Sequence, residues 1–212
     1  MNSIPFPPMQ RPLVAILRGI KPEETADIVG ALIDAGMTAI EIPLNSPEPF
    51  RSIEIAVKRA SDGILVGAGT VLTVEDVARL HDVGGRLMVS PNVDPDVIAA
   101  ATARGMVTMP GVFTATEALL ALKAGASGLK FFPASVLGAA GITAIRAVLP
   151  AGLMIAAVGG VSDTNFAEYA KAGITAFGLG GSLYKPGMST AEVAGRAKVT
   201  VEAYDRAVQR GG

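Results

Sequence analysis

Lys130 lies inside an apolar segment of the chain, where burial would take its ammonium group out of water. The segment reads Gly128-Leu129-Lys130-Phe131-Phe132-Pro133. Loss of hydration disfavours the charged form of a lysine and lowers its pKa towards neutrality. A neutral amine in a dry pocket is a nucleophile for a ketone, so Lys130 is a candidate for covalent catalysis. The alternative interpretation is a structural lysine that is paired with a carboxylate.

Glu41 is an acid inside a second apolar segment, Ala39-Ile40-Glu41-Ile42-Pro43-Leu44. Burial raises the pKa of a carboxyl group, and a neighbouring cation lowers it. A carboxyl group tuned in this way suits proton transfer. The alternative is a buried ion pair between Glu41 and Lys130. Both interpretations place the two side chains in one cavity.

Two glycine-rich segments indicate an anion site, Val158-Gly159-Gly160-Val161-Ser162 and Gly178-Leu179-Gly180-Gly181-Ser182. Backbone N–H groups approach an oxyanion closely where no side chain obstructs them, and helix N-termini favour anions. We therefore predict a phosphate site on these segments. The alternative is that both pairs only form tight strand-to-helix turns.

Arg18 and Thr70 are candidates for binding a second anionic group. Arg18, in Leu17-Arg18-Gly19, could bind a carboxylate through its forked guanidinium, or could be a surface loop residue. Thr70, in Gly67-Ala68-Gly69-Thr70, could add a hydroxyl donor, or could cap a helix. Gly19, Gly67 and Gly69 are expected to leave room for a ligand.

Other kinds of site have few residues to use. The chain has no cysteine and one histidine, His81 in a polar stretch, so thiolate, His-rich metal and Ser-His-Asp sites are disfavoured. Lys plus Arg number 18 and Asp plus Glu number 19, a net charge of −1 that does not favour nucleic-acid binding. No segment resembles a membrane span or a signal peptide, so we expect a cytoplasmic protein.

The elements that must position these residues alternate between apolar segments and amphipathic segments. Eight apolar segments are candidate parallel strands, since they are apolar almost throughout: Leu13–Gly19, Thr38–Leu44, Leu65–Thr70, Leu87–Asn92, Met106–Gly111, Gly128–Ala134, Met154–Val161 and Ala176–Tyr184. Helical patterns with Pro, Asp, Thr or Ser near their starts lie between them. The pattern predicts a single-domain α/β fold, a (β/α)8 barrel over residues 11–212 after an irregular arm over residues 1–10. The alternative is a doubly wound open sheet.

In such a barrel the carboxyl ends of the strands carry the chemistry. The candidate residues described above come at or near the ends of predicted strands. The pattern therefore brings Arg18, Glu41, Thr70, Lys130 and the glycine-rich segments to one face of the barrel.

Several motifs in order resemble the 2-keto-3-deoxy-6-phosphogluconate aldolase family (KDPG/KHG aldolases) along nearly the whole chain. They are Glu41-Ile42-Pro43-Leu44, Gly67-Ala68-Gly69-Thr70-Val71, Ser90-Pro91-Asn92, Gly128-Leu129-Lys130-Phe131-Phe132-Pro133 and Val158-Gly159-Gly160-Val161. The resemblance implies a class I aldolase with no metal and no organic cofactor, and a homotrimer.

The same resemblance implies a role for each candidate residue. Lys130 would form the Schiff base and Glu41 would be the general acid and base. Thr70 and an arginine would hold the pyruvyl carboxylate, and Pro91 and Phe132 would wall the pyruvyl pocket. The phosphate ligands would be Gly159, Gly160, Gly180, Gly181 and Ser182. The substrate would be a phosphorylated keto-deoxy sugar acid, and the products pyruvate and glyceraldehyde 3-phosphate.

Two positions depart from the phosphogluconate branch of this family. That branch often has an arginine four residues after the strand-two glutamate, where this chain has Asn45, and a threonine where it has Val158. Together with Arg18, these features resemble the phosphogalactonate branch, whose substrate is the C4 epimer. A threonine hydroxyl can bond a C4 oxygen and valine cannot, so we expect Val158 to favour the galactonate epimer.

Three other functions remain alternatives at this point. One is cleavage of the gluconate epimer by the same chemistry. Another is a phosphosugar isomerase or epimerase that uses Glu41 as an enolising base without an imine. The last is a non-catalytic phosphosugar-binding protein, which is disfavoured because burying Lys130 and Glu41 without using them is costly.

Overall fold

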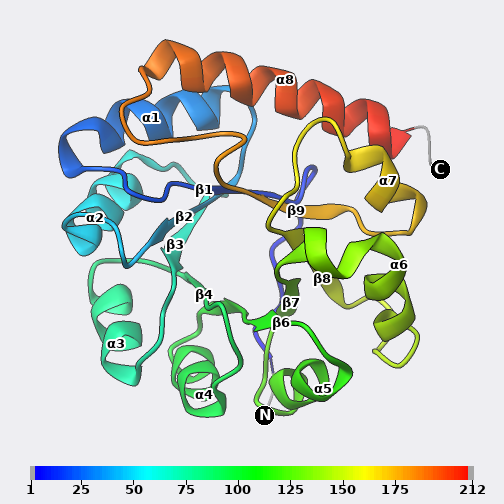
Figure 1. Cartoon of the computed structure of the whole chain (residues 1–212). Coiled ribbons are helices and arrows are strands. Elements are labelled where there is room, and N and C mark those ends of the chain that lie inside the picture. Colours follow the sequence, from blue (N-terminus) through cyan, green and yellow to red (C-terminus); the bar gives the residue numbers. More distant parts are fainter. Residues whose placement is uncertain (1–2, 210–212) are drawn as a thin grey trace.

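A computed structural model describes residues 3–209, whose strands form one parallel sheet that curls into a barrel (Figure 1). The strands are β1 (Leu13–Ile16), β2 (Ala39–Pro43), β3 (Leu65–Gly69), β4 (Leu87–Val89), β5 (Val107–Met109), β6 (Gly111–Val112), β7 (Gly128–Phe131), β8 (Met154–Val158) and β9 (Ala176–Leu179). Their order in the sheet is β5-β4-β3-β2-β1-β9-β8-β7-β6. The predicted barrel is confirmed, and the open-sheet alternative is wrong.

One predicted strand, Met106–Gly111, is split in two at Pro110. Proline has no N–H group, so Pro110 divides the segment into β5, which pairs with β4, and β6, which pairs with β7. The split segment still closes the barrel against β7. Ser127 N donates to Thr108 O at 3.1 Å, Lys130 N to Pro110 O at 3.0 Å, and Phe132 N to Val112 O at 3.2 Å. The ninth strand is thus a division of the fifth strand of an eight-stranded plan.

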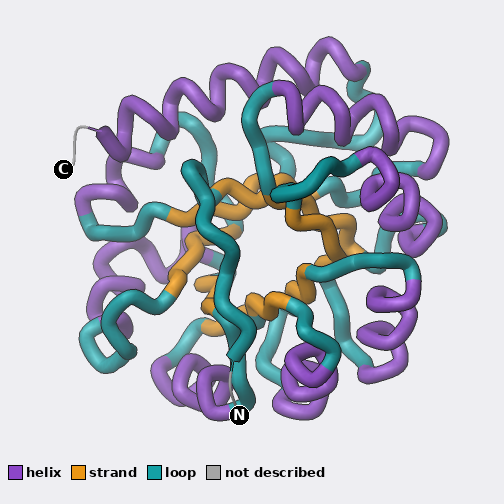
Figure 2. The backbone as a smooth tube through the Cα atoms, turned by 180° about the vertical axis from the view of Figure 1, so that it is seen from behind, coloured by secondary structure: helices purple, strands orange, loops and turns teal. Residues whose placement is uncertain are grey.

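The helices surround the barrel as an outer ring (Figures 1 and 2). They are α1 (Pro22–Asp34), α2 (Pro49–Arg59), α3 (Val74–Asp82), α4 (Pro95–Ala103), α5 (Ala115–Lys123), α6 (Ala134–Arg146), α7 (Phe166–Lys171) and α8 (Thr190–Gln209). Local capping starts several of them. The Thr73 side chain accepts from Asp76 N at 3.1 Å, and the Thr114 side chain accepts from Glu117 N at 3.3 Å. No helix within residues 3–209 combines the length and apolar character needed to cross a membrane.

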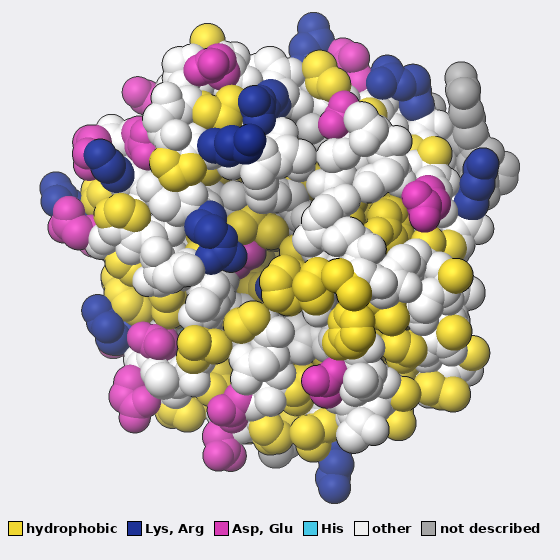
Figure 3. Space-filling view, in the orientation of Figure 1, with side chains coloured by type: hydrophobic (Ala, Val, Ile, Leu, Met, Phe, Trp, Pro, Cys, Tyr) yellow, Lys and Arg dark blue, Asp and Glu magenta, His cyan; other side chains and the backbone are white. Residues whose placement is uncertain are grey.

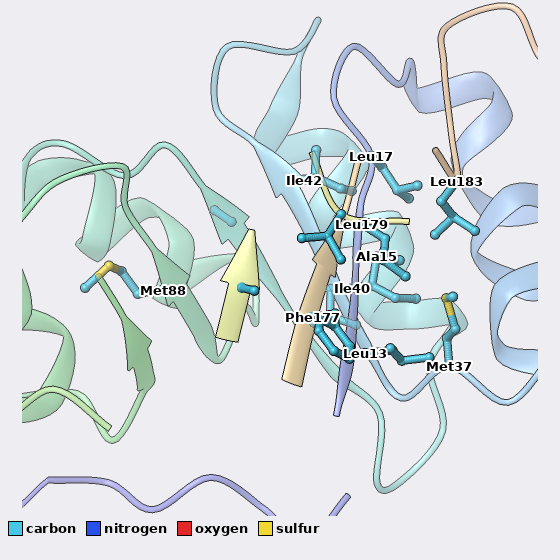
Figure 4. Packing of buried hydrophobic residues seen from close by; sticks show 14 of the residues in the cluster. Leu13, Ala15, Leu17, Met37, Ile40, Ile42, Met88, Phe177, Leu179 and Leu183 are labelled. Carbon is cyan, nitrogen blue, oxygen red and sulfur yellow. The ribbon is translucent and has the colours of Figure 1, made fainter. Parts of the chain in front are cut away.

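Two apolar layers follow from the alternation of side chains along each strand. On β1, Leu13 and Ala15 belong to the layer between sheet and helices, whereas Val14 and Ile16 belong to a second cluster with interior residues of other strands. Figure 4 shows side chains of the first layer from β1, β2 and β9 gathered against one another. Rigid packing on both faces fixes the strands and hence the residues at their ends.

The segment before β1 covers the amino-terminal end of the barrel. Ile4, Phe6 and Met9 pack against the interior cluster. Figure 2 shows this segment crossing the barrel opening. Residues 3–9 are irregular, and they make part of the barrel's packing. The predicted bounds of arm and barrel include residues 1–2 and 210–212, which lie outside the described chain.

Candidate active site

A cavity of about 480 Å³ lies at the carboxyl ends of the strands. All twelve residues that the sequence nominates line it: Arg18, Glu41, Thr70, Pro91, Lys130, Phe132, Val158, Gly159, Gly160, Gly180, Gly181 and Ser182. Figure 3 shows a hollow near the centre of this face, with acidic and basic side chains in it and beside it. The fold therefore brings the candidates together from segments distant in sequence.

Lys130 on β7 and Glu41 on β2 meet inside the barrel from distant strands. They are 7% and 2% exposed, respectively. Burial raises the pKa of Glu41, and the charges of Lys130 and Arg18 oppose this rise. Burial lowers the pKa of Lys130. The charge of Glu41 raises this pKa, and the charge of Arg18 lowers it. Desolvation is the largest cause for both groups and favours their neutral forms.

The two groups do not use each other as direct partners. The ion pairs found among residues 3–209 do not include a contact between them. Glu41 Oε2 is buried and has no hydrogen-bond partner within that part of the chain. An unpartnered buried polar atom costs about 1–3 kcal/mol, so the one on Glu41 needs an explanation, and a ligand in the cavity would supply one. This geometry favours the chemical interpretation over the structural ion pair.

Three glycines expected to make room for a ligand instead make room for protein atoms. A Cβ on Gly69 would clash with Glu41 Oε2, and one on Gly67 would clash with the carbonyl oxygen of Leu87. A Cβ on Gly19 would lie 2.7 Å from Pro186 Cγ. The expectation of ligand space was therefore wrong at these positions. Gly69 is needed so that the carboxyl group of Glu41 fits over β3.

Thr70 directly follows β3, and Arg18 comes two residues after the end of β1. Arg18 Nη1 donates to Asn45 Oδ1 at 2.7 Å. Thr70 has φ of 57°, a left-handed conformation that is rare for a β-branched residue and is typically kept at functional sites. The alternative role of Thr70 as a helix cap is wrong, because Thr73 is the N-cap of α3.

The two glycine-rich segments form adjoining turns after β8 and β9. Gly159 and Gly160 have φ of 91° and 77°, so the turn requires glycine as well as exposing its backbone. Ser182 Oγ donates to Val161 O at 3.2 Å, which joins the two turns. Among the hydrogen bonds of the described chain, the N–H groups of Gly160, Gly181 and Ser182 have no acceptor. These donors suit a phosphate group.

The sequence also predicted that helix N-termini contribute to the anion site, and the structure does not support this part of the prediction. α7 has six residues and begins at Phe166, and α8 begins only at Thr190, so neither turn runs directly into a helix. Residues 162–165 form a separate turn in which Ser162 N donates to Asn165 Oδ1 at 2.9 Å. Asn165 Nδ2 donates to Gly160 O at 2.9 Å. The predicted site would therefore bind a phosphate group through free backbone N–H groups rather than through a helix dipole.

The apolar wall of the cavity includes Phe132 and Pro91. Lys130 Nζ lies 5.1 Å from the centroid of the Phe132 ring. Four further residues line the cavity: Ile16, which sequence reasoning missed, and Val161, Ser162 and Gly178, which belong to the predicted anion-binding segments but were given no role of their own. Ile16 could have been found from its inward position on β1, whereas the others are neighbours of nominated residues. No group of three or more His, Cys, Asp or Glu side chains placed to hold a metal occurs in the described range.

Fold and site together define a (β/α)8-barrel enzyme whose cavity opens at the carboxyl ends of its strands. The family model described as KDPG and KHG aldolase matches residues 9–193, and the chain belongs to this family. It is accordingly a class I aldolase, a lyase acting on a carbon–carbon bond. The isomerase and binding-protein alternatives are disfavoured.

Individual relatives resemble the chain along nearly its full length. The "Probable 2-dehydro-3-deoxy-6-phosphogalactonate aldolase" of Rhizobium meliloti is 72% identical over 205 residues, with 97% of both chains covered. The 2-dehydro-3-deoxy-6-phosphogalactonate aldolase of Escherichia coli is 49% identical over 198 residues, covering 93% of this chain and 97% of that one. A solved structure described as "Native KDPGal structure" has a TM-score of 0.93 at 48% identity, covering 95% of this chain and 98% of that chain.

Proposed function

We propose that the protein cleaves 2-dehydro-3-deoxy-6-phosphogalactonate to pyruvate and D-glyceraldehyde 3-phosphate through a Schiff base on Lys130. The observation that carries this proposal is that one cavity contains both a buried amine, Lys130, and a buried carboxyl group, Glu41, that has no hydrogen-bond partner among the described residues. Burial lowers the pKa of Lys130 and raises that of Glu41. A lowered pKa gives the Lys130 amine more of its neutral, nucleophilic form, and a raised pKa makes the Glu41 carboxylate a stronger base.

The reaction begins when the neutral Lys130 amine attacks the C2 ketone. Loss of water from the carbinolamine gives an iminium ion, which is an electron sink. Glu41, as carboxylate, takes the proton of the C4 hydroxyl, and the C3–C4 electron pair moves towards the iminium. Glyceraldehyde 3-phosphate leaves and an enamine remains. Protonation of the enamine at C3 and hydrolysis of the imine release pyruvate and restore Lys130.

The remaining lining residues hold the two ends of the substrate. Arg18 and Thr70 bind the carboxylate next to the ketone, and Pro91 and Phe132 wall the pyruvyl group. The turns containing Gly159, Gly160, Gly180, Gly181 and Ser182 bind the phosphate. Binding energy from this distant phosphate then serves to orient the reacting carbons.

Val158 supports the choice of the galactonate epimer. Its side chain is 4% exposed and lines the cavity, and it offers no hydroxyl to a C4 oxygen. A substrate hydroxyl placed against it would lose its hydrogen-bond partner. The names of the two relatives described above point to the same epimer.

Pyruvate release from each C4 epimer, followed with a coupled lactate dehydrogenase assay, tests the function. We expect turnover with a clear preference for the galactonate epimer. Equal or greater turnover of the gluconate epimer would retain the aldolase and refute the epimer assignment.

Trapping with borohydride tests the Schiff base. In the presence of pyruvate, borohydride should fix an adduct on Lys130, and Lys130→Ala should abolish both adduct and turnover. Lys123→Ala, which alters a lysine on α5, is a matched control. An adduct only at another lysine would refute the assignment of Lys130.

We also propose that the enzyme works as a cytoplasmic homotrimer without metal or organic cofactor. Its exposed apolar side chains support assembly, among them Val136 at 71%, Val148 at 60% and Leu119 at 49%. Light scattering of the purified protein should give three times the mass of the chain, and treatment with a chelator should leave turnover unchanged.

A further inference from the structure

The turn after β2 holds the turn after β1 through two consecutive pairs of residues. Arg18 Nη1 donates to Asn45 Oδ1 at 2.7 Å, and Gly19 N donates to Ser46 Oγ at 2.9 Å. The strands before these turns are in register, with Ile16 beside Glu41. Arg18 is thus fixed by side chain and backbone relative to the strand that carries Glu41.

The Arg18 backbone has little freedom to move away from this position. Gly19 has φ of 82°, a conformation that other residues adopt with strain. The Pro186 ring occupies the space in which a Gly19 side chain would lie. Ser46 is 8% exposed, so its hydrogen bond to Gly19 N is sheltered from water. The side chain of Arg18 remains its main source of freedom.

Asparagine is well suited to fixing an arginine that must bind an anion. A free arginine side chain has large rotamer entropy, which an anion would have to overcome on binding. The amide oxygen of Asn45 accepts one N–H group without cancelling the positive charge. No carboxylate forms an ion pair with Arg18 among the described residues. The guanidinium keeps its charge and its remaining donors for a ligand.

The charge of Arg18 acts on both Glu41 and Lys130. Arg18, Glu41 and Lys130 line the same cavity. The phosphogluconate branch often has an arginine at the position of Asn45, in the turn after β2. This chain has its arginine, Arg18, in the turn after β1 instead. In this chain the cation comes from β1, and the β2 turn supplies its support.

We propose that Asn45 is a positioning residue that holds Arg18 in the orientation that binds the carboxylate of the 2-keto acid. The proposal rests on the function proposed above, in which Arg18 is the carboxylate ligand. It assigns Asn45 to the carboxylate end of the substrate and leaves the phosphate end independent of it.

The test is a double-mutant cycle on pyruvate binding. The pyruvate concentration that half-saturates borohydride trapping is measured for the wild type, Asn45→Ala, Arg18→Met and the double variant. We expect Asn45→Ala to raise this concentration about fivefold, the size of one net hydrogen bond, with trapping at saturation unchanged. In the Arg18→Met background the same change should have no effect. Inhibition by inorganic phosphate should be equal in wild type and Asn45→Ala.

Two further variants separate orientation from loop stability. Pro47→Ala changes an exposed residue of the same turn, where a proline side chain has no hydrogen-bonding group. It loosens the turn without touching Arg18, so its half-saturating concentration should match wild type. Asn45→Asp keeps an acceptor for Arg18 but neutralises its charge, so it should weaken pyruvate binding more than alanine does.

The outcomes distinguish this inference from the proposed function. Absence of trapping in the wild type overturns both. Normal trapping in the wild type with an unchanged half-saturating concentration in Asn45→Ala overturns the inference alone. An equal effect of Asn45→Ala with and without Arg18 also overturns it, since Asn45 would then not act through Arg18.

Discussion

At the scale of single residues, the site depends on charged groups held where their neutral forms are favoured. Lys130 and Glu41 could be nominated from sequence because each interrupts an apolar strand. The sequence could not show that they avoid a direct ion pair, because that depends on side-chain geometry across the barrel. It also did not show that Asn45 contacts Arg18, since their spacing of 27 residues carries no local signal.

The first prediction concerns the pH at which the imine forms. Because burial lowers the pKa of Lys130 from its ordinary value of 10.5, trapping by borohydride with pyruvate should reach half its maximum well below pH 10.5. The charge of Glu41 raises this pKa and that of Arg18 lowers it. Glu41→Gln should therefore move the midpoint down, and Arg18→Met should move it up. A wild-type midpoint near 10.5 would contradict the proposed burial effect.

The same shift predicts how stability changes with pH. The folded pKa of Lys130 lies below its unfolded value, so between the two the unfolded chain binds more protons and the free energy of unfolding rises with pH. To isolate this effect, urea unfolding of Glu41→Gln is compared with Glu41→Gln/Lys130→Met from pH 7 to pH 10. The free energy of unfolding of Glu41→Gln should rise with pH relative to that of the double variant. A constant difference would show that Lys130 has no altered pKa.

A further residue-scale prediction concerns Val158. A threonine there supplies a hydroxyl that can bond a C4 oxygen of the gluconate epimer. Val158→Thr should raise kcat/KM for that epimer relative to the galactonate epimer by about tenfold, which corresponds to about 1.4 kcal/mol. Val158→Ala, which adds no hydroxyl, is the control and should not shift the ratio towards gluconate. No shift with threonine would show that the epimer is selected elsewhere in the cavity.

At the scale of elements, periodicity in the sequence predicted the strands better than their ends. Every predicted strand exists, but the final run Ala176–Tyr184 is a strand only to Leu179. Glycine and apolar residues continue past the strand, so composition does not reveal where pairing stops. The break at Pro110 was not predicted, although the missing N–H group of a proline could have indicated it. The shortness of α7 had no such indication, since Ser162 and Asn165 form a turn typical of a helix start.

Packing between β2 and β3 gives the element-scale prediction. A methyl group on Gly69 would overlap the Glu41 carboxyl group, so Gly69→Ala must displace it. Turnover should fall at least about a hundredfold, and the free energy of unfolding should fall by about 1–3 kcal/mol from overpacking. Gly195→Ala is the control, because a Cβ at Gly195 on α8 has open space. It should keep full activity and gain about 0.5–1 kcal/mol. Retained turnover in Gly69→Ala would argue against Glu41 as the proton carrier.

At the scale of the whole molecule, the two ends of the barrel have separate tasks. The carboxyl end holds the polar cavity, and the amino end is covered by the segment before β1 (Figure 2). Arg11 ties the start of the barrel to α8 through Asp205, with Arg11 Nε donating to Asp205 Oδ1 at 2.7 Å. The sequence predicted an irregular arm from its prolines, and could not show that its apolar residues complete the interior packing.

This division predicts that stability and catalysis can be separated at Phe6. Phe6 is half-buried against the interior cluster, and Phe6→Ala should reduce the free energy of unfolding by about 1–2 kcal/mol through lost apolar burial. Because the cavity with Lys130 lies at the opposite end of the strands, kcat and KM at a temperature well below unfolding should match wild type. Pro8→Ala, at an exposed position of the same segment, controls for a general effect on the arm. Urea unfolding and the coupled pyruvate assay on the same preparations measure both quantities. If Phe6→Ala is as stable as wild type, the arm does not contribute to the stability of the barrel. If kcat falls while the protein stays folded, packing at the amino end affects the residues of the cavity.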